Sequence, residues 1–483
     1  MLLGLDLGTS SVKALLIEDD GDAVGEDSAP YPVRAPRPGW AESSPDEWWA
    51  AVVAATEAAL GRCGSEVTAL GLSGQMHGVI LADGAGLPLR PAVLWADSRS
   101  GLELAAYRGL DEDLRCRLAN PPAVGMAGPS LLWLRDHEPD VYASARWALQ
   151  PKDWLRMRLT GDVAAEPSDA SATLLFDLIA DDWSRAAVED LGLRAELLAP
   201  LVPSADVAGM LTAEAAGELG LRRGLPVAAG AADTAAAMLG VGLLRPGTVQ
   251  LTIGTGGQIV TPKESPDADP HLRTHLYRGA SPGLWYSMAA IQNAGLALEW
   301  VRKVLGVTWS EVYDEAFAVP PGSGGVTFLP YLSGERTPRF DPGARGAWTG
   351  LGLDHTRGHL LRAALEGFAF ALREGLEALE DLGIFAPELR LAGGGASGKS
   401  GGPWRQLLAD MLGRPLWLLP DEISSVASAR GAAFLAGLAS GAYPSPKDTL
   451  PLTPKPQRPI TPGDTDYETA YKRYEELYPR LYG

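Results

Sequence analysis

Cysteine is nearly absent from this chain, whose 483 residues include only Cys63 and Cys116. Two cysteines cannot form the disulfide framework on which small secreted proteins depend, so this usage favours a reducing compartment. The first residues also lack the basic region and the cleavage signal of a secretory leader. We therefore expect the protein to be cytoplasmic.

Positive charge is scarce as well. The 41 lysines and arginines are outnumbered by 60 aspartates and glutamates, and the net charge is −19. A chain of this charge repels nucleic acid and anionic membrane surfaces, so neither is expected as a partner. A small neutral molecule remains allowed as a ligand.

Long hydrophobic runs are few, and residues 224–244 come closest to the length of a membrane span. This run is mostly alanine and glycine, which are weakly apolar, and it has a charge near its centre, Asp233. We therefore expect no membrane-spanning helix. The composition, 46% hydrophobic and 21% charged, is that of an ordinary globular protein. The length suits about three domains of roughly 150 residues, or two larger ones.

The start of the chain predicts a strand, a tight turn and a second strand over residues 2–24. Leucines alternate with glycine and aspartate over residues 3–8, which is the period of a strand, and Asp6 lies near its end. A carboxylate facing a turn rich in backbone amides can hold Mg²⁺ through water while the amides bind nucleotide phosphates. The alternative is an ordinary hairpin with a glycine turn. The turn and the next strand supply Gly8, Thr9, Ser10 and Lys13.

A similar pattern returns at residues 248–260, where an alternating strand leads into a second glycine-rich turn, 254–257. This repeat indicates two related halves, with the second starting near residue 245. Near the end of the chain, a proline-rich connector precedes four tyrosines at helical spacing, which predict a helix that docks onto the rest. The four are Tyr467, Tyr471, Tyr474 and Tyr478.

Other stretches predict the elements between these motifs. A helix should begin at Ser44 and Pro45, with Glu47 completing a capping box. Residues 355–379 predict a long helix with an apolar side. Strands are expected within 67–83, 91–95, 224–228 and 388–392, each followed by a polar or glycine-rich turn. The apolar side of the long helix holds Leu361, Leu365, Phe368 and Leu372.

Seven motifs follow one another along the chain: LDLGTSSVK, GQMHG, VLWADSR, PKDWLRMRLTG, GAADTAAAMLGVG, FLPYLSGERTPRFDPGARGAWTGL and LAGGGAS. In this order and spacing they resemble the FGGY carbohydrate kinases, up to about residue 440. GQMHG and YLSGERTP favour the xylulokinase branch over the glycerol kinase branch. The resemblance implies an α/β protein with the actin-like ATPase fold, in which two ribonuclease-H-like domains flank a cleft.

The resemblance implies a kinase of carbohydrate metabolism that uses ATP and Mg²⁺ to phosphorylate a ketopentose, D-xylulose to D-xylulose 5-phosphate. Residues 1–244 would bind the sugar and carry the catalytic aspartates. Residues 245–483 would bind the nucleotide and end in the docking helix. The expected partners are the sugar and ATP, and a homodimer is one assembly the chain allows. Two alternatives stay open: a kinase for another pentulose or a polyol, such as ribulose or a sugar alcohol, and a non-catalytic actin-like nucleotide-binding protein.

Asp233 is expected to be the general base, because it resembles the catalytic aspartate of the family. Its setting favours this role independently, since a lone carboxylate among alanines and glycines is costly to bury unless a ligand or metal visits it. The alternative is that Asp233 caps the helix that follows. Asp6 resembles the family's carboxylate near the metal and the transferred phosphate. Asp6 and Asp233 are therefore the expected metal ligands.

The resemblance also implies the residues of both substrate sites. The sugar would contact Met76, His77, Trp95, Asp233 and Thr234, with Asp97 and Arg99 as further candidates. The nucleotide would be held by Gly8, Thr9, Ser10, Lys13, Thr255, Gly256, Gly295, Glu299, Gly394, Gly395 and Ala396. Two amide-rich turns, 8–10 and 254–256, would hold the phosphates from both sides.

Some positions depart from the family pattern. Thr234 and Ala96 stand where asparagines are usual, so they leave the identity of the sugar open. Residues 393–400, GGGASGKS, match the Walker A pattern, but patterns this short recur by chance, and the role of Lys399 is left open. His271 and His275 are spaced for a metal only on a helix, whereas the sequence around them favours a strand or loop, so zinc is not expected.

Overall fold

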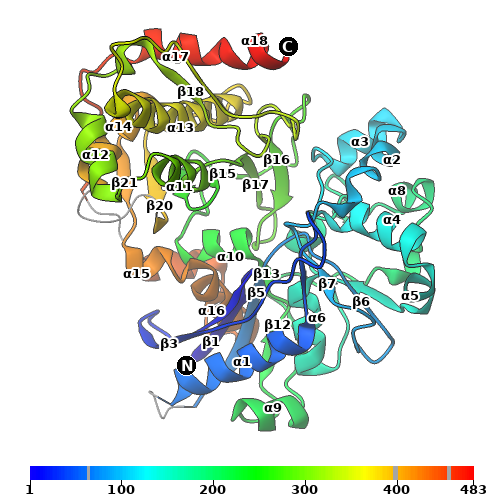
Figure 1. Cartoon of the computed structure of the whole chain (residues 1–483). Helices are drawn as coiled ribbons and strands as arrows, with labels where there is room; N and C mark the ends of the chain where they lie inside the picture. Colours follow the sequence, from blue (N-terminus) through cyan, green and yellow to red (C-terminus); the bar gives the residue numbers. More distant parts are fainter. Residues whose placement is uncertain (62–65, 395–400, 454–457) are drawn as a thin grey trace.

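The structure is a computed structural model that describes residues 1–61, 66–394, 401–453 and 458–483 (Figure 1). Two mixed β-sheets dominate it. The first sheet has the strand order β11-β12-β5-β1-β2-β3, with β13 beside β5. The second has the order β16-β17-β15-β14-β20-β21.

The two sheets share one plan. In the first, β3, β2 and β1 are antiparallel neighbours, and β1, β5 and β12 run parallel. In the second, β17, β15 and β14 are antiparallel, and β14, β20 and β21 run parallel. The expected repeat is therefore confirmed in topology. The strands of the first sheet are β1 (Leu2–Leu7), β2 (Ser11–Ile17), β3 (Ala23–Pro30), β5 (Ala69–Gly74), β11 (Val207–Met210), β12 (Pro226–Ala228) and β13 (Ala231–Ala232). Those of the second are β14 (Val249–Ile253), β15 (Gly257–Lys263), β16 (His275–Arg278), β17 (Trp285–Ile291), β20 (Leu389–Ala392) and β21 (Leu416–Leu418).

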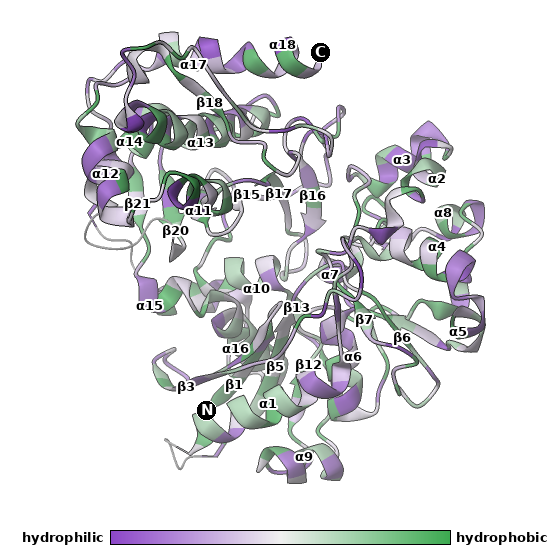
Figure 2. Cartoon of the chain, in the orientation of Figure 1, coloured by the Kyte–Doolittle hydropathy of each residue, from purple (hydrophilic) through white to green (hydrophobic). Residues whose placement is uncertain are grey.

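Helices surround both sheets (Figure 1). The first sheet has α1 (Pro45–Leu60), α6 (Pro151–Thr160), α9 (Ala213–Leu219), α10 (Asp233–Gly240) and α16 (Ala427–Ser440) around it. The second has α11 (Gly295–Val304), α12 (Trp309–Phe317), α13 (Arg357–Glu380), α14 (Gly402–Leu412), α17 (Glu468–Glu475) and α18 (Leu477–Tyr482). The short α15 (Asp421–Ser424) precedes α16. Figure 2 shows α1 and strands β1 and β5 largely in green, where their apolar side chains form the first core.

A third group of short elements lies to the right in Figure 1. Its helices enclose a hydrophobic core of their own that includes Leu131, Leu134 and Leu175. The short α7 (Pro167–Ala170) packs beside β13 of the first sheet and β16 of the second. The group contains α2 (Leu104–Arg108), α3 (Glu112–Leu118), α4 (Ala127–His137), α5 (Pro139–Ser144), α8 (Arg185–Asp190), β6 (Ile80–Ala82), β7 (Ala92–Val93) and β8 (Trp147–Leu149).

The predicted long helix is confirmed as α13, whereas the predicted C-terminal docking helix is divided into two short helices, α17 and α18. On α13 the four apolar residues named above are completely buried in the second core. Tyr467, Tyr471 and Tyr474 are at most 5% exposed and belong to the same core. The C-terminal tyrosines are thus packing residues.

Helix α1 begins at Pro45 as predicted, but the predicted capping box is wrong. The Ser44 side chain makes no capping hydrogen bond. The Glu47 carboxylate forms a two-pronged ion pair with the guanidinium of Arg34. Both carboxylate oxygens of Glu47 accept from Arg34, and this bidentate geometry sets the orientation of the carboxylate.

Helix α16 follows the second sheet in sequence but packs on the first. A Cβ on Gly4 of β1 or Gly71 of β5 would overlap backbone atoms of α16. A Cβ on Gly431 of α16 would overlap the Ala236 carbonyl of α10 in the same way. Absent side chains therefore let α16 lock α10, which begins at Asp233, against the first sheet.

The described helices include none that is both long and apolar enough to cross a membrane. His275 lies on strand β16, as the sequence around it predicted. Within the described ranges, no group of three or more His, Cys, Asp or Glu side chains is arranged to hold a metal ion.

Candidate active site

Strand β1 carries Asp6 to one end of the first sheet. Asp6 faces Lys13 across β2 and Ser73 across β5. Its Oδ1 atom is buried and has no hydrogen-bond partner in the described part of the chain. Burial raises the pKa of Asp6, and the positive charge of Lys13 opposes that rise. Within the described residues, the buried Oδ1 of Asp6 is therefore available to a ligand.

Asp233 is the first residue of α10, directly after β13. Its Oδ1 accepts hydrogen bonds from Thr234 N at 2.5 Å and Thr234 Oγ1 at 3.1 Å. Burial, followed by the negative charge of Asp6, raises the pKa of Asp233 to about 7. The helix-cap alternative does not hold, because Ala232 occupies the N-cap position. A carboxylate with this pKa can take up a proton near neutral pH.

Both carboxylates line one cavity of about 240 Å³ between the two sheets. The first half of the chain contributes Asp6, Gly8, Asp233 and Thr234 to its wall. The second half contributes Thr252, Gln258 and Ala392, with Ala427 and Ser428 from the start of α16. The cavity has a charged side and a neutral side.

The first glycine turn, residues 8–10, is fastened on several sides. The Gly8 carbonyl accepts hydrogen bonds from Tyr31 Oη and Gln75 Nε2. Trp95 Nε1 donates to Thr9 Oγ1 at 2.9 Å, so Trp95 lies against this turn. Farther along β2, the Lys13 ammonium donates to the Ser425 carbonyl, which comes from the segment before α16. The turn is therefore preorganised.

The second glycine turn, residues 254–256, sits on the first residues of α11. Gly295 N donates to the Gly254 carbonyl, and Leu296 N donates to the Thr255 carbonyl, both at 3.0 Å. A Cβ on Gly295 would overlap that Gly254 carbonyl, so this glycine permits a close approach of backbones. On the exposed side of α11, Glu299 pairs with Arg302, whose hydrogen bond lowers the pKa of Glu299 to about 2.

Gly394 follows β20, and a Cβ built on it would meet no atom within 4 Å among the residues that the structure describes. The preceding Gly393, with φ +94°, packs against the Ile253 carbonyl at the end of β14. Gly395, Ala396 and the Walker A-like residues up to Ser400 lie outside the described residues.

Met76 and His77 form the turn after β5, where the two halves meet. His77 has φ +71°, and its Nδ1 lies 2.8 Å from the Ala172 carbonyl. Because a carbonyl only accepts, Nδ1 carries the hydrogen, and Nε2 of the neutral ring is an acceptor. Burial lowers the pKa of His77 to about 4, so the ring is neutral. Met76 Sδ accepts from Tyr286 Oη of the second half at 3.8 Å.

Asp97 and Arg99, the further candidates for the sugar side, are engaged elsewhere. Arg99 pairs with Asp97 and Glu42, at 2.7 and 2.8 Å, and its guanidinium stacks on Trp40. Asp97 also accepts from Ala41 N at 2.6 Å. These two side chains brace the loop that presents Trp95.

Arg336 is a residue to which sequence reasoning assigned no role, although it lies in the motif YLSGERTP. Its backbone is fixed by Glu335 Oε1, which accepts from Arg336 N at 2.8 Å. The Arg336 charge helps to lower the pKa of both His77 and His275. The second half thus adds a cation beside the predicted sugar residues. The only signal in the sequence was the motif itself.

Two related sheets, a cavity between them and two carboxylates beside a glycine turn define a phosphoryl-transfer site. Sequence models of the FGGY family of carbohydrate kinases match the chain, the N-terminal domain over residues 1–240 and the C-terminal domain over 249–440. The chain belongs to this family, and the predicted actin-like ATPase fold is confirmed. It is an enzyme that phosphorylates a sugar, with ATP as the phosphoryl donor.

Within the family, the chain is similar to xylulose kinases. It is 35% identical to the xylulose kinase of Escherichia coli K12, over 100% of this chain and 98% of the relative. The solved structure of a xyloylose kinase from Brucella ovis superposes with a TM-score of 0.92 at 38% identity, covering 99% of both chains. That of a xylulose kinase from Rhodospirillum rubrum gives 0.90 at 32% identity, covering 99% of this chain and 98% of the other.

Proposed function

We propose that the enzyme converts D-xylulose and ATP into D-xylulose 5-phosphate and ADP. The observation that carries the proposal is the pair Asp6 and Asp233 on one wall of a shared cavity, opposite a neutral wall. The names of its relatives support xylulose as the sugar. In the reaction the sugar hydroxyl oxygen bonds to the γ-phosphorus, the bond from that phosphorus to the bridging oxygen breaks, and ADP leaves.

The hydroxyl proton passes to Asp233 in this proposal. Thr234 holds Oδ1 through two hydrogen bonds, which leaves Oδ2 for the proton. A pKa of about 7 matches a base that works near neutral pH. In a loose transition state the proton leaves late, so the position of Asp233 matters at least as much as its basicity.

Asp6 and Asp233 fit Mg²⁺. A carboxylate oxygen of Asp6 is buried without a partner, and the repulsion between the two carboxylates contributes to the raised pKa of Asp233. Mg²⁺ is commonly bound through one or two carboxylates together with substrate phosphates, so a larger protein cage is not required. When bound, the ion neutralises charge on the phosphoryl oxygens.

The sugar would lie against Met76, His77, Trp95 and Thr234. His77 Nε2 would accept from a sugar hydroxyl, and the Met76 side chain would pack on a carbon face of the sugar. Both residues lie close to the second half, through Tyr286 and Arg336. Closing the halves on the sugar would exclude water from the γ-phosphate.

We further propose that residues 1–244 supply the chemistry and residues 245–483 most of the nucleotide site. The first turn would reach the phosphates through Gly8, Thr9 and Ser10, with Lys13 close by. The second half would contribute Thr255, Gly256, Gly295, Glu299 and Gly394, together with Gly395 and Ala396. Support for the adenosine part is the open space at Gly394, where a flat base could approach the backbone.

The test is ADP release from Mg-ATP with a panel of pentuloses, hexuloses and polyols, and with no sugar. Selective stimulation by D-xylulose is expected. Stimulation by ribulose or a sugar alcohol alone would contradict the proposed sugar and point to Thr234 and Ala96. ATP hydrolysis that no sugar stimulates would contradict the proposed reaction.

The homodimer and the cytoplasmic location expected from the sequence remain predictions. Light scattering on the purified enzyme at several concentrations tests the first, and fractionation of cells tests the second.

A further inference from the structure

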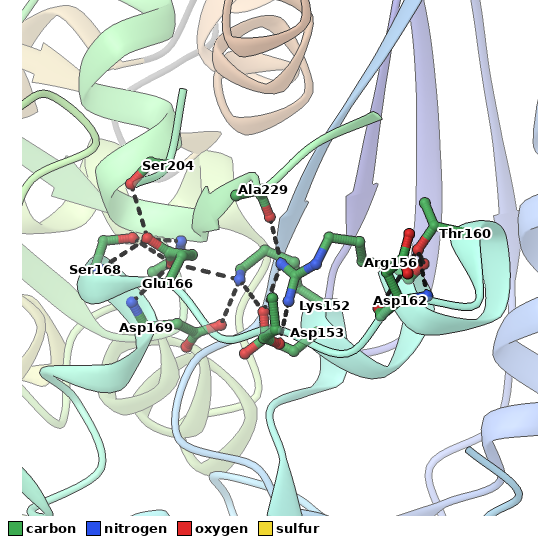
Figure 3. A network of polar contacts seen from close by, with 12 residues as sticks. Lys152, Asp153, Arg156, Thr160, Asp162, Glu166, Ser168, Asp169, Ser204 and Ala229 are labelled. Atoms are coloured by element: carbon green, nitrogen blue, oxygen red, sulfur yellow. Dashed lines mark hydrogen bonds and ion pairs between the residues drawn. The ribbon is translucent and has the colours of Figure 1, made fainter. Parts of the chain in front are cut away.

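A buried ionic cluster on α6 and α7 takes no part in the mechanism above. Lys152 Nζ lies 2.6 Å from Asp153 Oδ1, 3.4 Å from Glu166 Oε1 and 3.5 Å from Asp169 Oδ2, and Arg156 Nη1 lies 2.9 Å from Asp153 Oδ1 (Figure 3). All five residues are at most 1% exposed. Such clusters are costly to bury, and apolar side chains often replace them without loss of stability. The role of the cluster is therefore to be sought in the parts of the chain that it positions, and not in a contribution to the stability of the fold.

The region of the cluster is joined to residues 229–232, the segment that leads into Asp233. Hydrogen bonds of Arg156, Ser204 and Ser168 make the connection, and Figure 3 shows the one between Arg156 and Ala229. They are Arg156 Nη1 to the Ala229 carbonyl at 2.6 Å, Gly230 N to the Ser204 carbonyl at 3.0 Å and Ala232 N to Ser168 Oγ at 2.9 Å.

Ser168 links the charges to this segment through one hydroxyl. Its Oγ donates to Glu166 Oε1 at 2.7 Å and accepts from Ala232 N at 2.9 Å. Strand β13 pairs with β5 at only two positions, Ala231 with Ser73 and Ala232 with Gly74. So short a strand needs further bonds to fix the start of α10. Ser428 Oγ of α16 donates to the Asp233 carbonyl at 3.1 Å, and Ser168 Oγ holds the Ala232 amide just before it.

The residues after Ser168 reach the sugar side and the second half. The Ala172 carbonyl meets Nδ1 of His77. Ser171 Oγ accepts from Arg278 N of β16 at 3.0 Å. The segment 168–172 thus contacts the residues before the base, the predicted sugar-binding histidine and the opposite sheet.

We propose that Ser168, held by Glu166, is a positioning residue for the kinase reaction. It fixes the backbone of Ala232 so that the Asp233 carboxylate meets the sugar hydroxyl; this rests on the role proposed above for Asp233. A base displaced by a fraction of an ångström loses much of its rate advantage, while substrate binding is little affected.

The test compares two buried serines that donate to the same carboxylate. Ser168→Ala removes the acceptor of the Ala232 amide. Ser204→Ala is the matched control, because Ser204 Oγ donates to the other oxygen, Glu166 Oε2, at 2.8 Å, and only its main chain contacts residues 229–232. We expect kcat of Ser168→Ala to fall on the order of 10- to 100-fold, with the KM of both substrates within about twofold. Ser204→Ala should keep kcat within about twofold, and equal kcat values in the two variants would overturn the proposal.

A double-mutant cycle separates positioning from general damage. In an Asp233→Asn background, Ser168→Ala should change the residual turnover by less than about twofold, because the group it positions is gone. The same fractional loss with and without Asp233 would overturn the proposal and leave the role of Asp233 intact. Full activity of Asp233→Asn alone would instead refute the proposed base, and the proposal with it.

Ser168→Cys covers the case in which the alanine variant does not fold. It nearly retains the side-chain volume, but a thiol is a weak acceptor. A smaller loss of kcat in the same direction is expected, and wild-type kcat in this folded variant would contradict the proposal.

Discussion

The two halves of the molecule form the same strand end and glycine turn from different residues. In the first half, LDLGTS (5–10) ends β1; in the second, LTIGTG (251–256) ends β14. Thr252 therefore takes the place of Asp6. The cross-strand neighbours of Asp6 are Lys13 and Ser73, and those of Thr252 are Gln258 and Ala392.

The difference shows how the same strand and turn can bind a cation and accept a proton in one half, and accept a nucleotide in the other. Asp6, Thr252 and Gln258 line the same cavity, but the carboxylates stand on its first-half side. A neutral wall accepts a polyanionic nucleotide without repulsion, whereas carboxylates placed opposite can hold a cation and accept a proton. The account therefore assigns chemistry to the first half and nucleotide binding mainly to the second.

Among variants that test the comparison of the two halves, Asp233→Asn is expected to lower turnover the most. Turnover should fall on the order of 10²- to 10⁴-fold, because the proton acceptor is lost. The folded pKa of Asp233, about 7, is above its ordinary value of 3.8, so its ionisation destabilises the fold as the pH rises between these values. Asp233→Asn should thus be more stable than wild type at pH 8, by about 1–2 kcal/mol. Turnover within tenfold of wild type would remove Asp233 from the mechanism.

Asp6→Asn should have the next largest effect, a loss of turnover on the order of 10²-fold. Since the negative charge of Asp6 raises the pKa of Asp233, the variant should also lower that pKa. The acidic limb of kcat/KM, expected near pH 7 in the wild type, would then move to lower pH. A shift to higher pH would show that the two carboxylates do not interact as described.

Gly394→Ala tests the nucleotide side. The added methyl meets no atom of the described residues within 4 Å, so the melting temperature should change little, whereas a bound adenosine would be crowded. We expect the KM for ATP to rise about tenfold with kcat little altered. Gly217→Ala on α9, where a Cβ also meets nothing within 4 Å, is the control. An unchanged KM would place the adenosine elsewhere.

Thr252→Val should have the smallest effect. It removes a hydroxyl that accepts from Gln250 Nε2 at 3.2 Å, but no charge. Turnover is expected to stay within about twofold of wild type, measured beside Asp6→Asn in the same assay. A loss as large as that of Asp6→Asn would break the division between a charged and a neutral wall.

Much of these two strand ends and their turns could be predicted from the sequence. The alternation in β1 and β14 and the glycine turns are local signals, and the order of motifs led to the fold. The long-range contacts were not predictable. No local pattern predicts that α16 packs against Gly4 and Gly71. That contact depends on glycines more than three hundred residues away in the sequence.

The charged side chains explain most of what the sequence did not predict. Glu47 was expected to share a capping box with Ser44, but the Ser44 side chain makes no capping bond and Glu47 pairs with Arg34. Lys152 gave no sign of being buried, because its three carboxylate partners come together only when α6 and α7 fold side by side. Pairing between distant charges is decided by tertiary structure, which a periodic pattern does not encode.

The most direct test of the division of labour is the Kd for ADP without a divalent cation, measured calorimetrically for wild type, Asp6→Asn and Asp233→Asn. The account predicts that ADP binding stays within about twofold in both variants while turnover falls by the amounts given above. A Kd that rises in step with the loss of turnover would contradict it, because the first-half carboxylates would then be part of the nucleotide site itself.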